Sequence, residues 1–166
     1  MLKRKRKETK AAEAEKAREF VGFQIGEELY GIDIHAIREI DRMQPVTRLP
    51  RSLPFIEGVI NLRGTVIPVI DMAKRFGVPP VEAGRRTRII IVRISGRSVG
   101  LAVEGVTGVL QLKESSIDPA PPLAFPVDRR HVEAVGRIEE GLIILLDLDL
   151  LLSVEEMAQL QQHPLS

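Results

Sequence analysis

Strand-like segments that recur at a constant interval constrain the fold of this 166-residue chain more than any other feature. Phe20–Ile34 reads as two short apolar strands around a glycine turn, and Thr87–Val103 repeats that pattern. Tyr30-Gly31 recurs as Val99-Gly100, 69 residues later. Chance similarity between hairpins is the alternative, but the matching glycines favour two β units of related plan packed together.

A second hairpin carries the most distinctive local sequence. Val59–Leu62 and Val66–Asp71 are β-branched or apolar runs, and Arg63-Gly64 lies between them as a turn in which glycine can adopt positive φ. Val66–Asp71 resembles Leu142–Asp147, 76 residues later. The hairpin tip Asn61–Gly64 carries an amide and a guanidinium but no nucleophile, which favours contact with another protein over catalysis.

Capping residues predict two helices. Asp71 can cap a short helix that Gly77 ends. The capping box Ser153-Val-Glu-Glu156 predicts a C-terminal helix. The apolar positions of that helix, which we expect to pack on the β units, are Val154, Met157 and Leu160.

Composition and charge bound the function. Hydrophobic residues make up 44% of the chain, enough for a core, and the absence of cysteine excludes thiolate catalysis and disulfides. Without a membrane-length apolar run or a secretory signal, we expect a cytoplasmic protein. Residues 1–18 hold eight Lys/Arg and three Glu, which predicts a basic, flexible tail. Residues 19–166 are acidic, with sixteen Lys/Arg and twenty Asp/Glu.

No pattern of catalytic or metal-ligating residues is present, so we predict no enzyme activity, cofactor or metal. The histidines His35, His131 and His163 lack ligand spacing. Turn and cap roles explain the acids that adjoin strand ends, which are Asp33, Asp71, Asp147 and Asp149. A hydrolase with paired carboxylates and a β-barrel nucleic-acid binder that uses the basic tail remain the alternatives. The scarcity of aromatic residues disfavours the second.

The chain resembles the CheW family of chemotaxis coupling proteins. Gly58–Gly64 followed by Val66–Asp71 looks like the family signature, and three further segments match it in order. They are Tyr30–Ile34 with Ile37, Glu39 and Ile40; Val99–Val106; and Ser153–Leu160. The similarity extends from about Glu19 to Leu160, although Arg88 stands where a β-branched apolar residue is common in the family.

The resemblance implies an all-β fold of two small, five-stranded, SH3-like barrels with short helices and a C-terminal helix. Residues 19–160 would form the CheW-like domain. Its first subdomain would hold residues 19–84 and the C-terminal helix, and its second residues 85–152, with 161–166 as a tail.

The resemblance also implies a non-enzymatic adaptor that couples chemoreceptor cytoplasmic tips to the regulatory domain of the histidine kinase CheA in a signalling array. It would approach the membrane only through receptors and bind no nucleic acid. An apolar groove bordered by Ile37 and Ile89 would receive the receptor tip. The positions that match the family's partner-binding residues are Ile37, Glu39, Gly58, Arg63, Gly64, Thr87, Arg88, Ile89, Val106 and Val109.

Two of these residues have alternative roles. The Arg63 guanidinium could bind a carboxylate bidentately, either that of Glu39 or one on a partner. Arg63 would then contribute to binding more than to folding. Ile37 is either a core residue or an exposed apolar contact.

Overall fold

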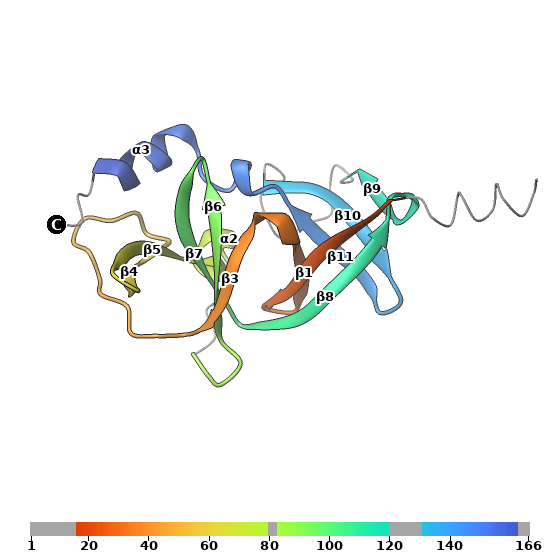
Figure 1. Ribbon diagram of the computed structural model, residues 1–166, viewed down its shortest axis with the longest axis horizontal. Helices are drawn as coiled ribbons and strands as arrows, with labels where there is room; N and C mark the ends of the chain where they lie inside the picture. Colours follow the sequence, from red (N-terminus) through yellow and green to blue (C-terminus); the bar gives the residue numbers. More distant parts are fainter. Residues whose placement is uncertain (1–15, 80–82, 120–130, 163–166) are drawn as a thin grey trace, which may run out of the picture.

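The computed structural model describes residues 16–79, 83–119 and 131–162, and within them it shows two β-sheets with few helices (Figure 1). The predicted all-β fold is confirmed. The predicted tail segments 1–15 and 163–166 and the residues 120–130 lie outside the described residues.

The first sheet has five strands in the order β3-β6-β7-β5-β4. Its strands are β3 (Ile37–Arg42), β4 (Ile56–Leu62), β5 (Thr65–Asp71), β6 (Arg88–Ile94) and β7 (Arg97–Val103). Neighbouring strands are antiparallel except β5 and β7, which are parallel. Apolar residues at alternate positions of β6 face opposite sides of this sheet: Ile89 and Ile91 on one, Ile90 and Val92 on the other.

The second sheet has six strands in the order β8-β1-β2-β11-β10-β9. They are β1 (Ala17–Ile25), β2 (Glu28–Asp33), β8 (Gly105–Lys113), β9 (Ile117–Pro119), β10 (Val132–Ile138) and β11 (Gly141–Leu146). The short β9 extends this sheet beyond the expected five strands. Of the 3₁₀ turns, η1 (Ile34–Ala36), η2 (Glu114–Ser116) and η4 (Leu148–Leu150) lie wholly within the described residues and connect strands or precede the last helix.

The strand pairing reproduces the repeat seen in the sequence. Gly31 of the β1–β2 hairpin and Gly100 of the β6–β7 hairpin occupy equivalent positions, opposite Gly22 and Ile91. Both glycines also face a parallel strand: Gly100 pairs with Val69, and Gly31 pairs with Leu145. A Cβ at either glycine would come within 2.9 Å of an isoleucine side chain, so a larger residue at either position would force its neighbours to move.

The two sheets exchange strands. β3 follows β2 in the chain but pairs with β6 of the first sheet, and β8 follows β7 but pairs with β1 of the second. The predicted subdomain boundary near residue 84 therefore does not separate the strands of one sheet from those of the other. The β1–β2 hairpin, although early in the chain, belongs to the sheet that contains β8 to β11. Local sequence could not show this, because each crossing strand pairs with a distant partner.

The largest apolar cluster lies between the sheets and ties them together. Phe23 and Tyr30 from the second sheet share it with Ile70 and Leu101 from the first. Ring centroids of Phe23 and Tyr30 are 5.9 Å apart, and those of Tyr30 and Phe76 are 5.2 Å apart. Smaller clusters fill each sheet's own interior. Because the largest core is shared, we expect the two sheets to unfold together.

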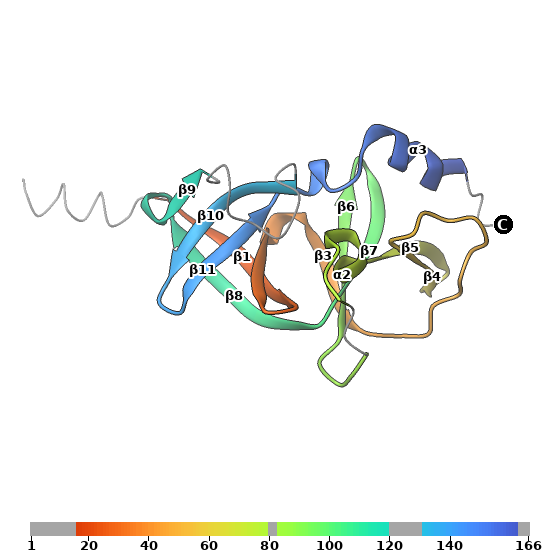
Figure 2. The ribbon, with the colours of Figure 1, turned by 180° about the vertical axis from the view of Figure 1, so that it is seen from behind.

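The predicted helix caps are confirmed. Helix α2 (Met72–Phe76) lies at the junction of the sheets (Figure 2), with its first turn capped by Asp71 and its end at Gly77, where φ is 69°. Helix α3 (Val154–Gln162) starts in the capping box, in which the Glu156 amide donates to Ser153 Oγ at 3.0 Å and the Ser153 amide donates to Glu156 Oε1 at 2.8 Å. Its Met157 and Leu160 pack on the core, but Val154, contrary to expectation, is 88% exposed.

Strand β1 starts earlier than the predicted end of the tail. Ala17 and Arg18 pair with Lys113 and Leu112 of β8. The Arg18 guanidinium contacts Asp33 at 3.4 Å and Glu133 at 3.1 Å. The tail boundary at residue 18 is therefore wrong by at least these two residues. None of the helices in the described part of the chain is long and apolar enough to cross a membrane.

Candidate partner-binding surface

The β4–β5 hairpin ends in the tight turn that the sequence predicts. Both turn residues have positive φ, 50° at Arg63 and 85° at Gly64, as a two-residue type I′ turn requires. The Asn61 side chain reinforces the turn by accepting a hydrogen bond from the Gly64 amide at 2.8 Å. Arg63 is held at this tip with 71% of its side chain exposed.

The Arg63 guanidinium is hydrogen-bonded to the Glu39 carboxylate on β3. The sequence left open whether Arg63 binds Glu39 or a carboxylate on a partner, and in the isolated chain it binds Glu39. This hydrogen bond, together with the arginine's positive charge, lowers the pKa of Glu39. The contact leaves most of the guanidinium in solvent, so Arg63 can also reach a second acceptor.

Asp41 is a member of this cluster that the sequence did not single out. It lies two residues after Glu39 on the same face of β3, and its Oδ2 is buried without a hydrogen-bond partner among the described residues. Burial, and then the negative charge of Glu39, raise the pKa of Asp41. The two-residue period of a strand could have indicated that Asp41 lies beside Glu39. That its Oδ2 is buried without a partner depends on how the surrounding strands pack.

Gly58 has a structural explanation. It lies at a bulge in β4 with φ of 151°, and a Cβ there would be 2.2 Å from the Thr47 carbonyl oxygen. This close approach lets Thr47 and Val59 exchange two backbone hydrogen bonds of 2.8 Å. Gly58 is buried, so it can shape the surface beside Arg63 but offers a partner little contact.

Thr87 and Arg88 lie where the chain enters β6. The Thr87 hydroxyl accepts a hydrogen bond from the Gly84 amide at 2.8 Å. Arg88 Nη1 donates to the carbonyl oxygens of Arg85 at 2.7 Å and Thr87 at 2.9 Å. Both side chains are half-buried, and each stabilises the turn that leads into the strand.

The predicted groove between Ile37 and Ile89 is wrong. Ile89 has no exposed surface and packs with Ile60 and Val69 inside the first sheet. Ile37 is half-buried against the shared core, on the other face of the sheet. The prediction failed because β6 is covered on both faces, so the apolar side chains on each face are buried in a cluster. Ile89 can support a partner contact but cannot make one.

Val106 and Val109 differ in exposure. Val106 is half-buried against the shared core, as Ile37 is, whereas Val109 is 56% exposed on β8. Ile40, on β3, is also 38% exposed. The predicted residues that reach the surface thus belong to β3, the β4–β5 turn, the entry to β6, and β8, a strand of the other sheet.

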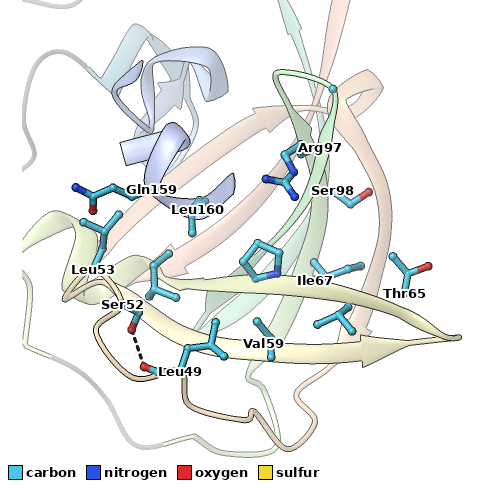
Figure 3. Close-up of a pocket in the computed structure, with 14 residues that line it drawn as sticks. Leu49, Ser52, Leu53, Val59, Thr65, Ile67, Arg97, Ser98, Gln159 and Leu160 are labelled. Atoms are coloured by element: carbon cyan, nitrogen blue, oxygen red, sulfur yellow. Dashed lines mark hydrogen bonds between the residues drawn. The ribbon is translucent and has the colours of Figure 1, made fainter. Parts of the chain in front are cut away.

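An apolar pocket of about 270 Å³ lies elsewhere, between the β4–β5 hairpin and the C-terminal end of α3 (Figure 3). Leu53, Val59, Ile67 and Leu160 line it, and Arg97 lies at its edge (Figure 3). Sequence patterns did not indicate it, because the loop before β4, the β4–β5 hairpin, the β6–β7 turn and α3 each contribute part of its wall.

Of the acids near strand ends, Asp33, Asp71 and Asp147 have the cap roles that the sequence indicated, and Asp149 lies in the turn η4. Asp33 accepts from the His35 amide at 2.9 Å, and Asp147 from the Asp149 amide at 3.0 Å. Asp33, Asp147 and Asp149 border one hollow together with Glu133. Although burial opposes ionisation of Asp33, hydrogen bonds from His35 and Arg18 lower its pKa, the opposite of what a general acid needs.

The histidines with described side chains do not form a metal site either. His131 is buried, with Nδ1 2.8 Å from the Leu150 carbonyl oxygen, and its ring is 5.9 Å from that of Phe76. Within the described residues, no group of three His, Asp or Glu side chains is placed to hold a metal ion.

Comparison with known proteins decides the family. The family model of the CheW-like domain matches residues 19–156. This chain belongs to the CheW family. The chemotaxis protein CheW of Klebsiella aerogenes is 40% identical over 140 residues, which cover 84% of each chain. CheW of Thermotoga maritima is 35% identical over 140 residues, covering 83% of this chain and 89% of the relative.

A solved CheW structure has the same fold. The scaffolding protein TtCheW from Thermoanaerobacter tengcongensis is 40% identical in sequence and superposes with a TM-score of 0.79. The similarity covers 85% of this chain and 96% of that protein. Family membership makes this chain a chemotaxis adaptor of the scaffolding type rather than an enzyme.

Proposed function

We propose that this CheW-family chain couples the cytoplasmic tips of chemoreceptors to the regulatory domain of the histidine kinase CheA. It would act in the cytoplasm, where receptor tips lie, and meet the membrane only through receptors. The observation that supports this most directly is the surface Glu39–Arg63 pair, which joins the edge strand β3 to the tip of the β4–β5 hairpin. An exposed donor fork at a fixed position suits recognition and offers no reacting group.

The receptor would contact the surface around this pair. Ile37, Glu39, Arg63 and Arg88 would contribute from the first sheet, with Thr87 shaping the turn beside Arg88. Val106 and Val109 would contribute from the second sheet. Gly58, Gly64 and Ile89 would support that surface through backbone geometry and packing. The kinase contact would join one of the two β-sheet units to a similar unit of CheA.

Titration of the full chain with a receptor cytoplasmic fragment and, separately, with the CheA regulatory domain tests the proposal. We expect both partners to bind and a ternary complex to form when all three are mixed. Binding to neither partner would overturn it. Strongly salt-dependent binding to duplex DNA, lost when residues 1–15 are removed, would instead support the nucleic-acid alternative.

A further inference from the structure

Four arginines gather at one corner of the first sheet. Arg42, the last residue of β3, is the direct cross-strand partner of Arg88, the first residue of β6. Arg85 and Arg86 precede Arg88 in the segment that enters the strand, and they are exposed, as is Arg42. We name Arg42, Arg85, Arg86 and Arg88 the arginine rim.

The positive charge of this rim is not neutralised within the described part of the chain. Arg88 Nη1 donates to two carbonyl oxygens, which carry no net charge. Glu104 lines the same hollow as Arg85 and Arg86, but its Oε1 accepts from the Gly26 amide at 2.9 Å. No carboxylate of the described residues lies within 4.0 Å of a rim guanidinium.

The rim is distinguished by the gathering of its four arginines rather than by the lack of acid partners, because Arg38, Arg48, Arg51, Arg93 and Arg97 also have no carboxylate partner among the described residues. Arg18, Arg63, Arg75 and Arg137 each contact at least one carboxylate. Like charges directly opposite each other on antiparallel strands destabilise the pair, so the Arg42–Arg88 juxtaposition is unfavourable in the isolated chain. An external acid would remove that repulsion. This makes the rim a place where binding can relieve an unfavourable interaction.

The rim adjoins the surface proposed for the receptor at the edge strand β3, where strand alternation places Arg42 on the face opposite Glu39. Arg88 and Thr87 belong to both, and Ile40, which is 38% exposed, lies two residues before Arg42 on the same face of β3. The surface thus combines an exposed apolar side chain with four positive charges. An amphipathic helix with one apolar anchor and acidic residues beside it would complement this arrangement.

We propose that the arginine rim binds carboxylates on the helical hairpin tip of the receptor and so selects receptors with acidic tips. This inference rests on the proposed coupling function and names the chemistry of one partner. A protein acid fits better than a nucleic-acid backbone, because residues 19–166 carry twenty Asp/Glu against sixteen Lys/Arg. The described aromatic rings Phe20, Phe23, Tyr30, Phe55 and Phe76 are all buried and offer no platform for bases.

The test uses two double variants of the full chain that remove the same charge. Arg85→Gln with Arg86→Gln changes the rim, while Arg48→Gln with Lys113→Gln changes exposed cations elsewhere. Each is titrated with a receptor cytoplasmic fragment and with the CheA regulatory domain at low and high salt, after a thermal melt confirms folding. The rim variant should bind the receptor fragment about tenfold more weakly and with a shallower salt dependence. The control should stay within about twofold, and the kinase affinity should not change.

A charge exchange then identifies the receptor acids. Arg85→Glu with Arg86→Glu should abolish receptor binding, and replacing acids of the receptor tip by lysine should restore it. Equal receptor affinity for the rim and control variants would overturn the rim proposal while leaving the coupling function intact. Failure of the unmodified chain to bind any receptor fragment would overturn both. Loss of DNA binding rather than receptor binding in the rim variant would assign the rim to nucleic acid and also overturn the proposal.

Discussion

The guanidinium of Arg63, at the tip of the β4–β5 hairpin, is hydrogen-bonded to the carboxylate of Glu39 on β3, 24 residues earlier in the chain. The two segments are not neighbours in the strand order of the sheet, because β6, β7 and β5 lie between β3 and β4. The curvature of the first sheet therefore brings its two edge strands close enough for their side chains to meet.

Replacing Arg63 should affect binding much more than folding. Arg63→Ala should leave the melting temperature nearly unchanged, because exposed ion pairs contribute little to stability. It should weaken binding to a receptor fragment or to the CheA regulatory domain about tenfold or more, and Arg63→Lys should recover only part of that loss. Titration and thermal melts of both variants check this. Unchanged affinity for both partners would leave Arg63 as an ordinary turn residue.

Asp41→Asn should make the protein more stable at neutral pH. Because the folded-state pKa of Asp41 is raised, ionising this carboxyl opposes folding. The protonated Asp41 carboxyl makes its full contribution to the free energy of unfolding below the ordinary pKa of 3.8. That contribution is lost as the pH rises through the raised pKa of Asp41 in the folded protein. The gain from asparagine should thus be present at neutral pH and vanish in acid. Denaturant unfolding at both pH values measures it, and a less stable variant at neutral pH would contradict the argument.

Helix α3 should depend on the Arg75–Glu156 contact. Arg75 donates to the two Glu156 carboxylate oxygens at 2.9 and 2.8 Å and to the Leu151 carbonyl oxygen at 3.0 Å. Arg75→Gln should therefore cost about 2 kcal/mol of unfolding free energy. Lys74→Gln is the matched control, since Lys74 makes a more exposed contact of 3.7 Å with Glu57. Equal effects of the two substitutions would show that the Arg75 contact is not special.

The same contact should contribute to acid sensitivity. Burial opposes ionisation of Glu156, but hydrogen bonds from Ser153 and Arg75 lower its pKa overall. Its stabilising contribution is thus full above the ordinary pKa of 4.5 and is lost as the pH falls through the lower folded value. Glu156→Gln should flatten the acid side of the stability profile, measured by melts across that range. A profile that keeps its full acid slope would refute this assignment.

Two glycines near Arg63 should respond differently to alanine. Gly58→Ala should destabilise the fold by about 2 kcal/mol or more, because the new Cβ meets the Thr47 carbonyl oxygen at a strained φ. Gly64→Ala should cost only about 1 kcal/mol, because its φ is positive but no atom lies within 4 Å of the added Cβ. Chemical denaturation compares them. If Gly58→Ala folds normally but no longer binds a partner, Gly58 is a contact residue after all.

Truncation separates the tail from β1. Removing residues 1–15 should leave the melting temperature nearly unchanged, because their sequence lacks the apolar periodicity needed to dock. Removing residues 1–18 should lower it, since Arg18 pairs with Asp33 and Glu133 and Ala17 pairs with Lys113. Equal melting temperatures for the two truncations would show that the first two residues of β1 do not stabilise the sheet.

Local sequence was sufficient for the turn and the helix caps, in which the interacting residues are adjacent or three positions apart. Arg63-Gly64 determines a type I′ turn through its φ angles, Asp71 caps α2, and Ser153 with Glu156 starts α3. The equivalent pairing of Gly31 and Gly100 was visible as a repeat, because both hairpins meet the same steric demand. The family signature likewise lies in continuous segments.

Tertiary structure alone decided the features that join distant segments. The exchange of β3 and β8 between sheets, the full burial of Ile89 and the unpaired oxygen of Asp41 depend on strands far apart in the chain. An apolar strand carries the same pattern whether one face or both are covered, so the sequence could not exclude Ile89 from a groove. The Arg42–Arg88 pair likewise exists only through the register of β3 against β6. The physical reason is that local rules set backbone angles, whereas the surface is set by which strands pair and which faces they bury.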